Sequence, residues 1–323
     1  MPTLSQLATR QIKQRGAADD AALEAIANAY ANMYDGLEGD IDALILAIEK
    51  LDNPTRREIE ALPQYKRLIR NAEDELDDFT TYLKTAIGAA GIAAIGMGLA
   101  HSEALINLSG VGFTSVSPSV MRSLLDFLQR GSPLYERLDM ITTATIESVV
   151  DAIISGIGQS FNPRKTADLI QDAFGGGLTD ALRNMRTVQI KAYQESARAN
   201  YIASDGIVTG WVWFANLNGN PCMSCVAMHG TEHTLDETLD DHYNGECAPL
   251  PLIPEFGNPV EQTGQSWFDG LSDSRQRELM GKGKHEAYKA GKFEFSALSN
   301  KQDHDIFGTM RTETPLKDLI GSE

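Results

Sequence analysis

The chain has 323 residues, of which 42% are hydrophobic and 23% are charged, and its formal net charge is -17 at pH 7. This composition is typical of a folded, soluble protein and excludes a mostly disordered chain. The acidic balance disfavours general attraction to nucleic acid, because proteins that bind it concentrate Lys and Arg on their surfaces. The length allows two or three domains, each with its own core.

The first two thirds of the chain is predicted to be helical, because its apolar residues recur at intervals of three and four. The expected helices cover residues 21–30, 41–48, 64–100, 120–129, 134–157 and 179–203. Asp35-Gly36 is expected to break the first of these segments. Asn162-Pro163 is expected to begin a further helix, and Gly175-Gly-Gly177 to interrupt it.

One helical segment, Ala86–Ala100, reads AIGAAGIAAIGMGLA and carries no charge. A membrane-spanning helix needs about 20 strongly apolar residues, whereas this run is shorter and rich in Ala and Gly. We therefore expect no stable membrane span here. Its glycines should instead let a neighbouring backbone approach closely. If the protein self-associates through this helix, that backbone belongs to a second copy of the chain. These glycines are Gly88, Gly91, Gly96 and Gly98.

The character of the sequence changes near residue 205, where Trp211, Val212 and Trp213 predict a strand. Downstream lie three cysteines, a proline-rich segment and a series of short apolar segments that predict short helices. The expected fold is mainly α with a small α+β C-terminal module, in which an elongated helical N-terminal half precedes a Cys/His module. The predicted regions are 1–112 (N-terminal helical), 113–204 (second helical), 205–265 (Cys/His module) and 266–323 (short-helix tail).

The three cysteines predict a metal site rather than a disulfide framework, because their number is odd and they lie in one short stretch. The two-residue gap in Cys222-Met-Ser-Cys225 lets both thiolates of a tight turn reach one tetrahedral metal. His242 and Cys247 follow within a short distance and complete four ligands of the kind that zinc prefers. We therefore predict a structural zinc ion bound by Cys222, Cys225, His242 and Cys247.

The identity of the histidine ligand stays open, because His229 or His233 could replace His242. In an alternative interpretation, the cysteines are small buried side chains or a redox pair, and the histidines are surface residues. Four protein ligands would make a closed structural site, whereas catalytic zinc keeps one position for water. A missing fourth ligand would reopen hydrolysis, with a neighbouring carboxylate as general base. The candidate bases are Glu232, Asp236, Glu237, Asp240 and Asp241.

Other catalytic patterns are missing from the sequence: it contains no phosphate-binding P-loop, no dinucleotide glycine fingerprint after a strand and no nucleophile elbow. Gly175-Gly-Gly177 follows a helical pattern and lacks the Lys and Ser or Thr of a phosphate cradle. The sequence therefore predicts that the protein is not an enzyme.

The order of motifs in the C-terminal part resembles that of the Mu F-like minor head proteins of tailed bacteriophages. The resemblance starts with Trp211-Val-Trp213-Phe-Ala, continues with the Cys222–Thr231 segment CMSCVAMHGT, and ends with the Asp241–Pro251 segment DHYNGECAPLP. With the helix around Arg186-Thr187 and the tail segment from Gln265 onwards, it covers roughly residues 180 to 310. The chain carries Glu246 where the family commonly has an arginine.

The resemblance implies a structural minor capsid protein that acts in head assembly, DNA packaging or DNA ejection. It implies a location at the portal vertex of the virion, and in the host cytoplasm during assembly. The implied partners are the portal protein, the major capsid or scaffolding protein, and packaged DNA. Two other functions stay open: a virion-borne zinc-dependent hydrolase (nuclease or peptidase), and an ejected membrane-active protein that uses Ala86–Ala100.

Overall fold

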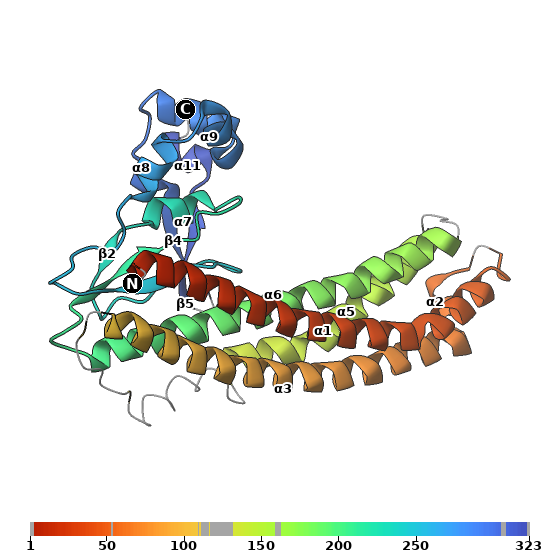
Figure 1. Cartoon of the computed structure of the whole chain (residues 1–323). Coiled ribbons are helices and arrows are strands. Elements are labelled where there is room, and N and C mark those ends of the chain that lie inside the picture. Colours follow the sequence, from red (N-terminus) through yellow and green to blue (C-terminus); the bar gives the residue numbers. More distant parts are fainter. Residues whose placement is uncertain are drawn as a thin grey trace. The chain divides into compact units, whose positions relative to one another are not determined.

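A computed structural model describes residues 3–52, 54–108, 110, 116, 132–158, 163–304 and 308–321. These residues are mainly helical, with two small sheets in the C-terminal part, which confirms the predicted fold class. The expected helix at 120–129 lies outside the described residues. The helices of the N-terminal part are α1 (Leu4–Ile48), α2 (Arg56–Ala61), α3 (Pro63–Asn107), α5 (Pro133–Gly158) and α6 (Pro163–Ala203) (Figure 1).

Two expected helix interruptions are wrong, because α1 continues through Asp35-Gly36 and α6 continues through Gly175-Gly-Gly177. A glycine inside a helix costs roughly 1 kcal/mol relative to alanine. Burial of apolar side chains on both sides of each glycine segment offsets this cost. In α6, for example, Phe174 and Ala181 are both fully buried.

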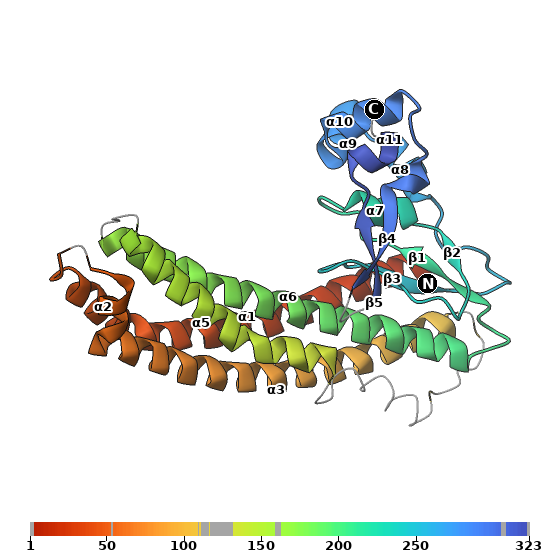
Figure 2. The same cartoon turned by 180° about the vertical axis from the view of Figure 1, so that it is seen from behind.

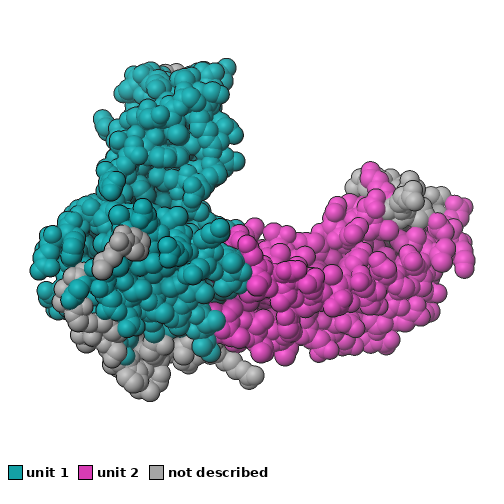
Figure 3. Space-filling view, viewed as in Figure 1, with its two compact units in different colours: residues 1–18, 91–126, 187–323 teal, residues 19–90, 127–186 magenta. Residues whose placement is uncertain are grey.

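The chain divides into two compact units, and the longest helices contribute residues to both (Figure 3). Unit 2 contains residues 19–90 and 127–186, so the helical segments of α1, α3, α5 and α6 form most of it. The Tyr30 ring packs edge-on against Phe79 with 4.8 Å between centroids, and its hydroxyl donates to the carbonyl of Phe174 at 2.6 Å. Aromatic contacts and buried aliphatic side chains thus hold this unit together.

Two neighbouring glycines of α6 are expected to respond oppositely to alanine substitution. A Cβ at Gly176 would meet no atom within 4 Å, so Gly176→Ala should raise the midpoint of urea unfolding, with a gain of about 0.5–1 kcal/mol. A Cβ at Gly177 would lie 2.5 Å from Oγ1 of Thr145 and 3.0 Å from the Tyr30 hydroxyl, so Gly177→Ala should cost about 1–3 kcal/mol. A stabilising Gly177→Ala would contradict the close packing described for unit 2.

Unit 1 contains residues 1–18, 91–126 and 187–323 and includes the complete C-terminal part. Its three-stranded antiparallel sheet places β1 (Gly210–Phe214) between β2 (Glu232–His233) and β3 (Ala248–Leu252) (Figure 2). Trp211 pairs with His233 on one side and with Pro251 on the other. The strand predicted from the aromatic cluster is therefore confirmed as β1. Helix α7 (Met223–Met228) follows it.

The C-terminal tail contains the expected short helices and one hairpin that the sequence did not predict. Its apolar core joins Phe268, Met280, Phe295 and Leu298 to side chains of α7. The strands of the hairpin, SNKQDH and GTMRTE, are mostly polar and partly exposed, so they lack the apolar alternation that marks a strand in a sequence. The elements of the tail are α8 (Gly264–Asp269), α9 (Asp273–Met280), α10 (Lys282–Lys289), η2 (Phe295–Leu298), β4 (Ser299–His304), β5 (Gly308–Glu313) and α11 (Leu316–Ile320).

The Ala86–Ala100 run belongs to the uninterrupted helix α3. Within the described part of the chain, α3 alone is long and apolar enough to cross a membrane by length and composition. The expected close backbone approach is confirmed at Gly98, where a Cβ would overlap the Tyr193 carbonyl and the Ser196 hydroxyl of α6. At Gly88 and Gly96, a Cβ would meet no atom of the described chain within 4 Å, so no neighbouring backbone of the same chain approaches there.

Candidate metal centre

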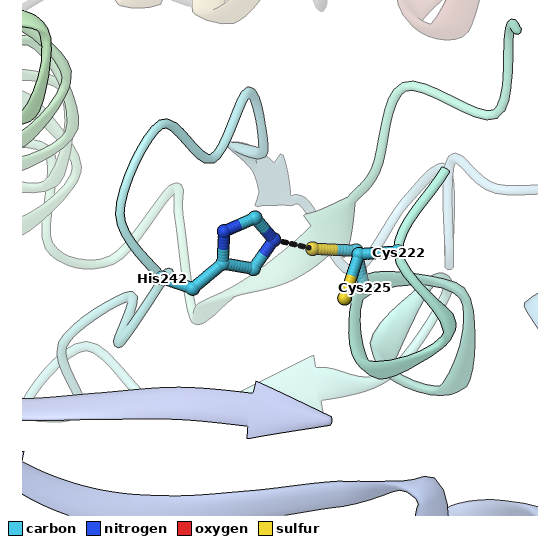
Figure 4. A group of neighbouring side chains, drawn as sticks. All are labelled: Cys222, Cys225 and His242. Carbon is cyan, nitrogen blue, oxygen red and sulfur yellow. Dashed lines mark hydrogen bonds between the residues drawn. The ribbon is translucent and has the colours of Figure 1, made fainter. Parts of the chain in front are cut away.

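Two elements of unit 1 bring Cys222, Cys225 and His242 together (Figure 4). Cys222 precedes the first residue of α7 and Cys225 lies in its first turn, so the short helix turns both thiols toward one point. His242 comes from the loop between β2 and β3. The two Sγ atoms and a ring nitrogen of His242 all lie within 4.8 Å of one another. The described chain therefore contains a Cys/Cys/His group within metal-binding distance.

The distance between Cys225 and His242 is close to that expected in a tetrahedral site. Zinc lies about 2.3 Å from sulfur and about 2.0–2.1 Å from nitrogen, which places ligand atoms about 3.5–3.8 Å apart. The Sγ of Cys225 lies 3.1 Å from Nε2 of His242. This distance differs from the ideal sulfur–nitrogen spacing by a few tenths of an ångström, and the distances to Cys222 lie within 4.8 Å.

The ring of His242 is oriented for coordination through Nε2. Its Nδ1 lies 2.7 Å from the backbone carbonyl oxygen of Tyr243, an acceptor that holds the proton on Nδ1. Metal-ligating histidines commonly make such a bond, because it fixes the tautomer and presents the other nitrogen to the metal. The backbone around His242 thus prepares Nε2 to face the two thiols.

The electrostatics of the group favour a thiolate. A hydrogen bond from Cys225 lowers the pKa of Cys222 to about 4, and the same bond raises the pKa of Cys225. Burial by itself would lower the pKa of His242, but its hydrogen bond to Cys222 and the charge of Asp241 raise that pKa to about 9. The lowered pKa of Cys222 favours the thiolate, which is the form of cysteine that binds metals.

Asp241 and Cys247 form a second group that shares Cys225 with the first. One ligand atom each of Cys225, Asp241 and Cys247 lies within 4.8 Å of the others. Cys247 is not part of the Cys222–Cys225–His242 group. The structure therefore brings three of the four predicted ligands together and places the fourth, Cys247, beside Cys225.

The Asp241 carboxylate organises the loop that carries the ligands. The side chain of Asp241 is only 1% exposed, and its two oxygens accept hydrogen bonds from the backbone N–H groups of His242 and Cys247, at 2.9 and 3.0 Å. A Cβ at Gly245 would overlap this carboxylate, so the loop requires glycine there. In the sequence, Asp241 is a candidate general base within an acidic run, and nothing there indicates its burial.

Buried donors from two helices fix the end of this loop. The backbone carbonyl of Cys247 accepts hydrogen bonds from Nη1 of Arg15 in α1, at 3.3 Å, and from Nε2 of Gln194 in α6, at 3.0 Å. The Arg15 guanidinium also lies over the Tyr193 ring, 5.0 Å from its centroid. The loop therefore ends against helices of unit 1 rather than in solvent.

The two competing histidines have other roles. Nδ1 of His229 accepts the backbone N–H of Ala215 at 3.0 Å, and burial lowers the pKa of His229 to about 4. The His233 ring stacks on Trp211 with 4.2 Å between centroids. Neither residue joins a metal-binding group in the described chain, and the interpretation of all three histidines as surface residues is wrong for the buried His229. No disulfide links the three cysteines.

The acidic residues considered as general bases have structural partners. The Glu237 carboxylate accepts the backbone N–H of Thr234 at 2.9 Å and lies 3.5 Å from Nδ1 of His233. Asp240 accepts the hydroxyl of Thr238 at 2.6 Å and pairs with Lys301 at 3.2 Å. These contacts give the two carboxylates a part in holding the loop between β2 and β3.

The structure adds one carboxylate that sequence reasoning missed. An oxygen of Glu313, at the end of β5, lies 4.0 Å from the Sγ of Cys222, and the same side chain pairs with Lys284. Nothing near Glu313 in the sequence marks it as part of a site, because the hairpin brings it there through tertiary contacts.

No known protein family, curated protein or solved structure matches the chain. The geometry of the Cys/His group and the order of the motifs around it are therefore the evidence that bears on function.

Proposed function

We propose that this chain is a structural minor capsid protein of a tailed bacteriophage, located at the portal vertex of the virion, with a structural zinc ion in its Cys/His module. The observation that carries the proposal is the convergence of Cys222, Cys225 and His242 within a module whose motif order resembles the Mu F-like minor head proteins. The proposed partners are the portal protein, the major capsid or scaffolding protein, and packaged DNA.

The donor set fits zinc. Two thiolates and one imidazole are ligands that zinc binds well in a tetrahedral arrangement. Cys222 and Cys225 would hold the ion from the start of α7, and His242 would hold it from the loop before β3. A bound zinc ion would supply a cross-link between these two segments, and structural zinc ions contribute directly to folding free energy. Rigidity of this kind suits a protein that docks on other capsid components.

The surroundings of the group support assembly rather than hydrolysis. A hydrolytic zinc site needs an open position for water and a carboxylate free to act as base. Here Glu237 and Asp240 are engaged in the hydrogen bonds of their own loop, and Asp241 is fully buried. These contacts argue against a role as general base for the three carboxylates.

The zinc part of the proposal is tested by elemental analysis of the purified chain. We expect about one zinc ion per wild-type chain and loss of the metal in Cys222→Ser and Cys225→Ser, because each removes a thiolate from a tetrahedral site. His101→Gln, which lies outside the group, serves as the control and should keep the metal. A wild-type chain that folds stably without metal would contradict the zinc assignment.

The capsid part is tested with particles of the phage that encodes the chain. Mass spectrometry of purified particles should detect the protein, and complementation with Cys225→Ser should reduce its incorporation and the yield of filled heads. His101→Gln should complement normally. Absence of the wild-type protein from purified particles would contradict the assignment to the virion.

A further inference from the structure

We infer that the buried carboxylate of Asp241 is the fourth ligand of the ion, which would then be held by Cys222, Cys225, His242 and Asp241, with Cys247 remaining a thiol beside it. The inference rests on the proposed zinc site and does not depend on the proposed role in the capsid. It changes the ligand set expected from the sequence, in which Cys247 held the fourth position.

Distances to the group favour the Asp241 carboxylate. Its Oδ1 lies 3.6 Å from the Sγ of Cys225 and 3.9 Å from Nε2 of His242. Carboxylate oxygens bind zinc at about 2.0–2.2 Å, so an oxygen ligand should lie about 3.3–3.6 Å from the nitrogen and sulfur ligands of a tetrahedral site. Oδ1 is therefore within a few tenths of an ångström of the required position relative to two of the three other ligands.

Two other side chains compete for the fourth position. Cys247 shares a second group with Cys225 and Asp241, and neither Cys247 nor Asp241 belongs to the group that contains Cys222 and His242. Glu313 lies 4.0 Å from Cys222, and its charge is already paired with Lys284. Asp241 approaches both ends of the group, the Cys225 sulfur on α7 and the His242 ring on the loop.

The hydrogen bonds of Asp241 leave room for a metal. An ionised carboxylate has about four lone-pair sites, and the structure gives this one the backbone N–H groups of His242 and Cys247 and a contact with the Cys225 thiol. The two backbone bonds hold the carboxylate in place. They would therefore position Oδ1 before an ion arrives.

Charge balance points the same way. A buried carboxylate needs a positive charge nearby, and in the metal-free protein the His242 ring, whose Nε2 lies 3.9 Å from Oδ1, faces Asp241. Because imidazole coordinates a metal in its neutral form, an ion in the group would itself supply the positive charge that faces Asp241. If Cys247 were instead a third thiolate ligand, the site would carry one further negative charge and leave Asp241 uncoordinated beside it.

Cobalt substitution of the full-length chain tests this ligand set, because the intensity of thiolate-to-cobalt charge-transfer absorption increases with the number of bound sulfurs. Co2+-loaded Cys247→Ala should keep the wild-type intensity, and Cys222→Ser should lose about half of it. Asp241→Asn should weaken Co2+ binding at least about tenfold. A loss of about one third in Cys247→Ala, with Asp241→Asn binding normally, would overturn the assignment.

A second measurement needs no variant and so does not depend on how variants fold. The 113Cd NMR shift of the Cd2+-loaded wild-type chain distinguishes a site with two sulfur ligands from one with three. A two-sulfur shift is expected. A three-sulfur shift would overturn the assignment of Asp241 and leave the metal site standing, whereas a wild-type chain that binds neither Co2+ nor Cd2+ would contradict the zinc proposal and this inference together.

Discussion

Replacement of Trp211 by alanine is expected to lower the free energy of unfolding of the C-terminal part by about 3–5 kcal/mol. Trp211 lies on the central strand β1 and is 0% exposed. Its ring stacks on His233 at an interplanar angle of 13°, and its indole N–H donates to the carbonyl of Glu237 at 3.1 Å. Alanine would leave a large cavity and an unsatisfied carbonyl, so both packing and hydrogen bonding would be lost.

Urea unfolding followed by circular dichroism measures this loss, and Phe256→Ala is the matched control. Phe256 is also a large aromatic residue of unit 1, but it is 56% exposed, so its removal should change the unfolding midpoint very little. Equal effects of the two substitutions would show that the core around β1 is not packed as described.

Gly264→Ala is expected to destabilise the contact between α7 and α8 by about 3 kcal/mol, at the upper end of overpacking costs. A Cβ at Gly264 would overlap the carbonyl oxygen of Val226 and lie 2.7 Å from its carbonyl carbon. Because these neighbours are backbone atoms of α7, no side-chain rotation relieves the clash. The Gly264 N–H also donates to the carbonyl of His229 at 3.0 Å, which ties the two backbones together at this point.

Gly270→Ala, at the other end of α8, is the control for this substitution. Gly270 has φ -75°, which any residue adopts, and a Cβ there would make ordinary contacts of 3.4 and 3.5 Å. Its effect should stay below about 0.5 kcal/mol. Calorimetry of both variants gives the comparison, and a neutral Gly264→Ala would mean that α7 and α8 do not approach each other this closely.

The sequence by itself predicted the helical class of the N-terminal part and the start of β1. Both depend on periodicity and on residue type within one short segment, which a sequence displays directly. The closeness of the Cys222 and Cys225 thiols was predictable from the sequence as well, because a two-residue gap places both of them on one turn.

The glycine segments show where local rules are overridden. Gly175-Gly-Gly177 disfavours a helix by propensity, yet α6 continues through it because the helix buries Phe174 and Ala181 on either side. The β4–β5 hairpin shows the opposite case. Its strands have little apolar pattern in the sequence, and they are stabilised by pairing with each other and by contact with α7.

The histidine of the metal group was decided by tertiary structure alone. His229, His233 and His242 could each serve as the ligand by spacing alone. In the structure, His229 accepts a hydrogen bond from Ala215 and His233 stacks on Trp211. Only His242 lies beside the cysteines. The same holds for Asp241, which in the sequence is one acidic residue of a run. Ligand geometry within one turn follows from distance along the chain, whereas burial and the meeting of separate loops follow from the packing of the whole unit.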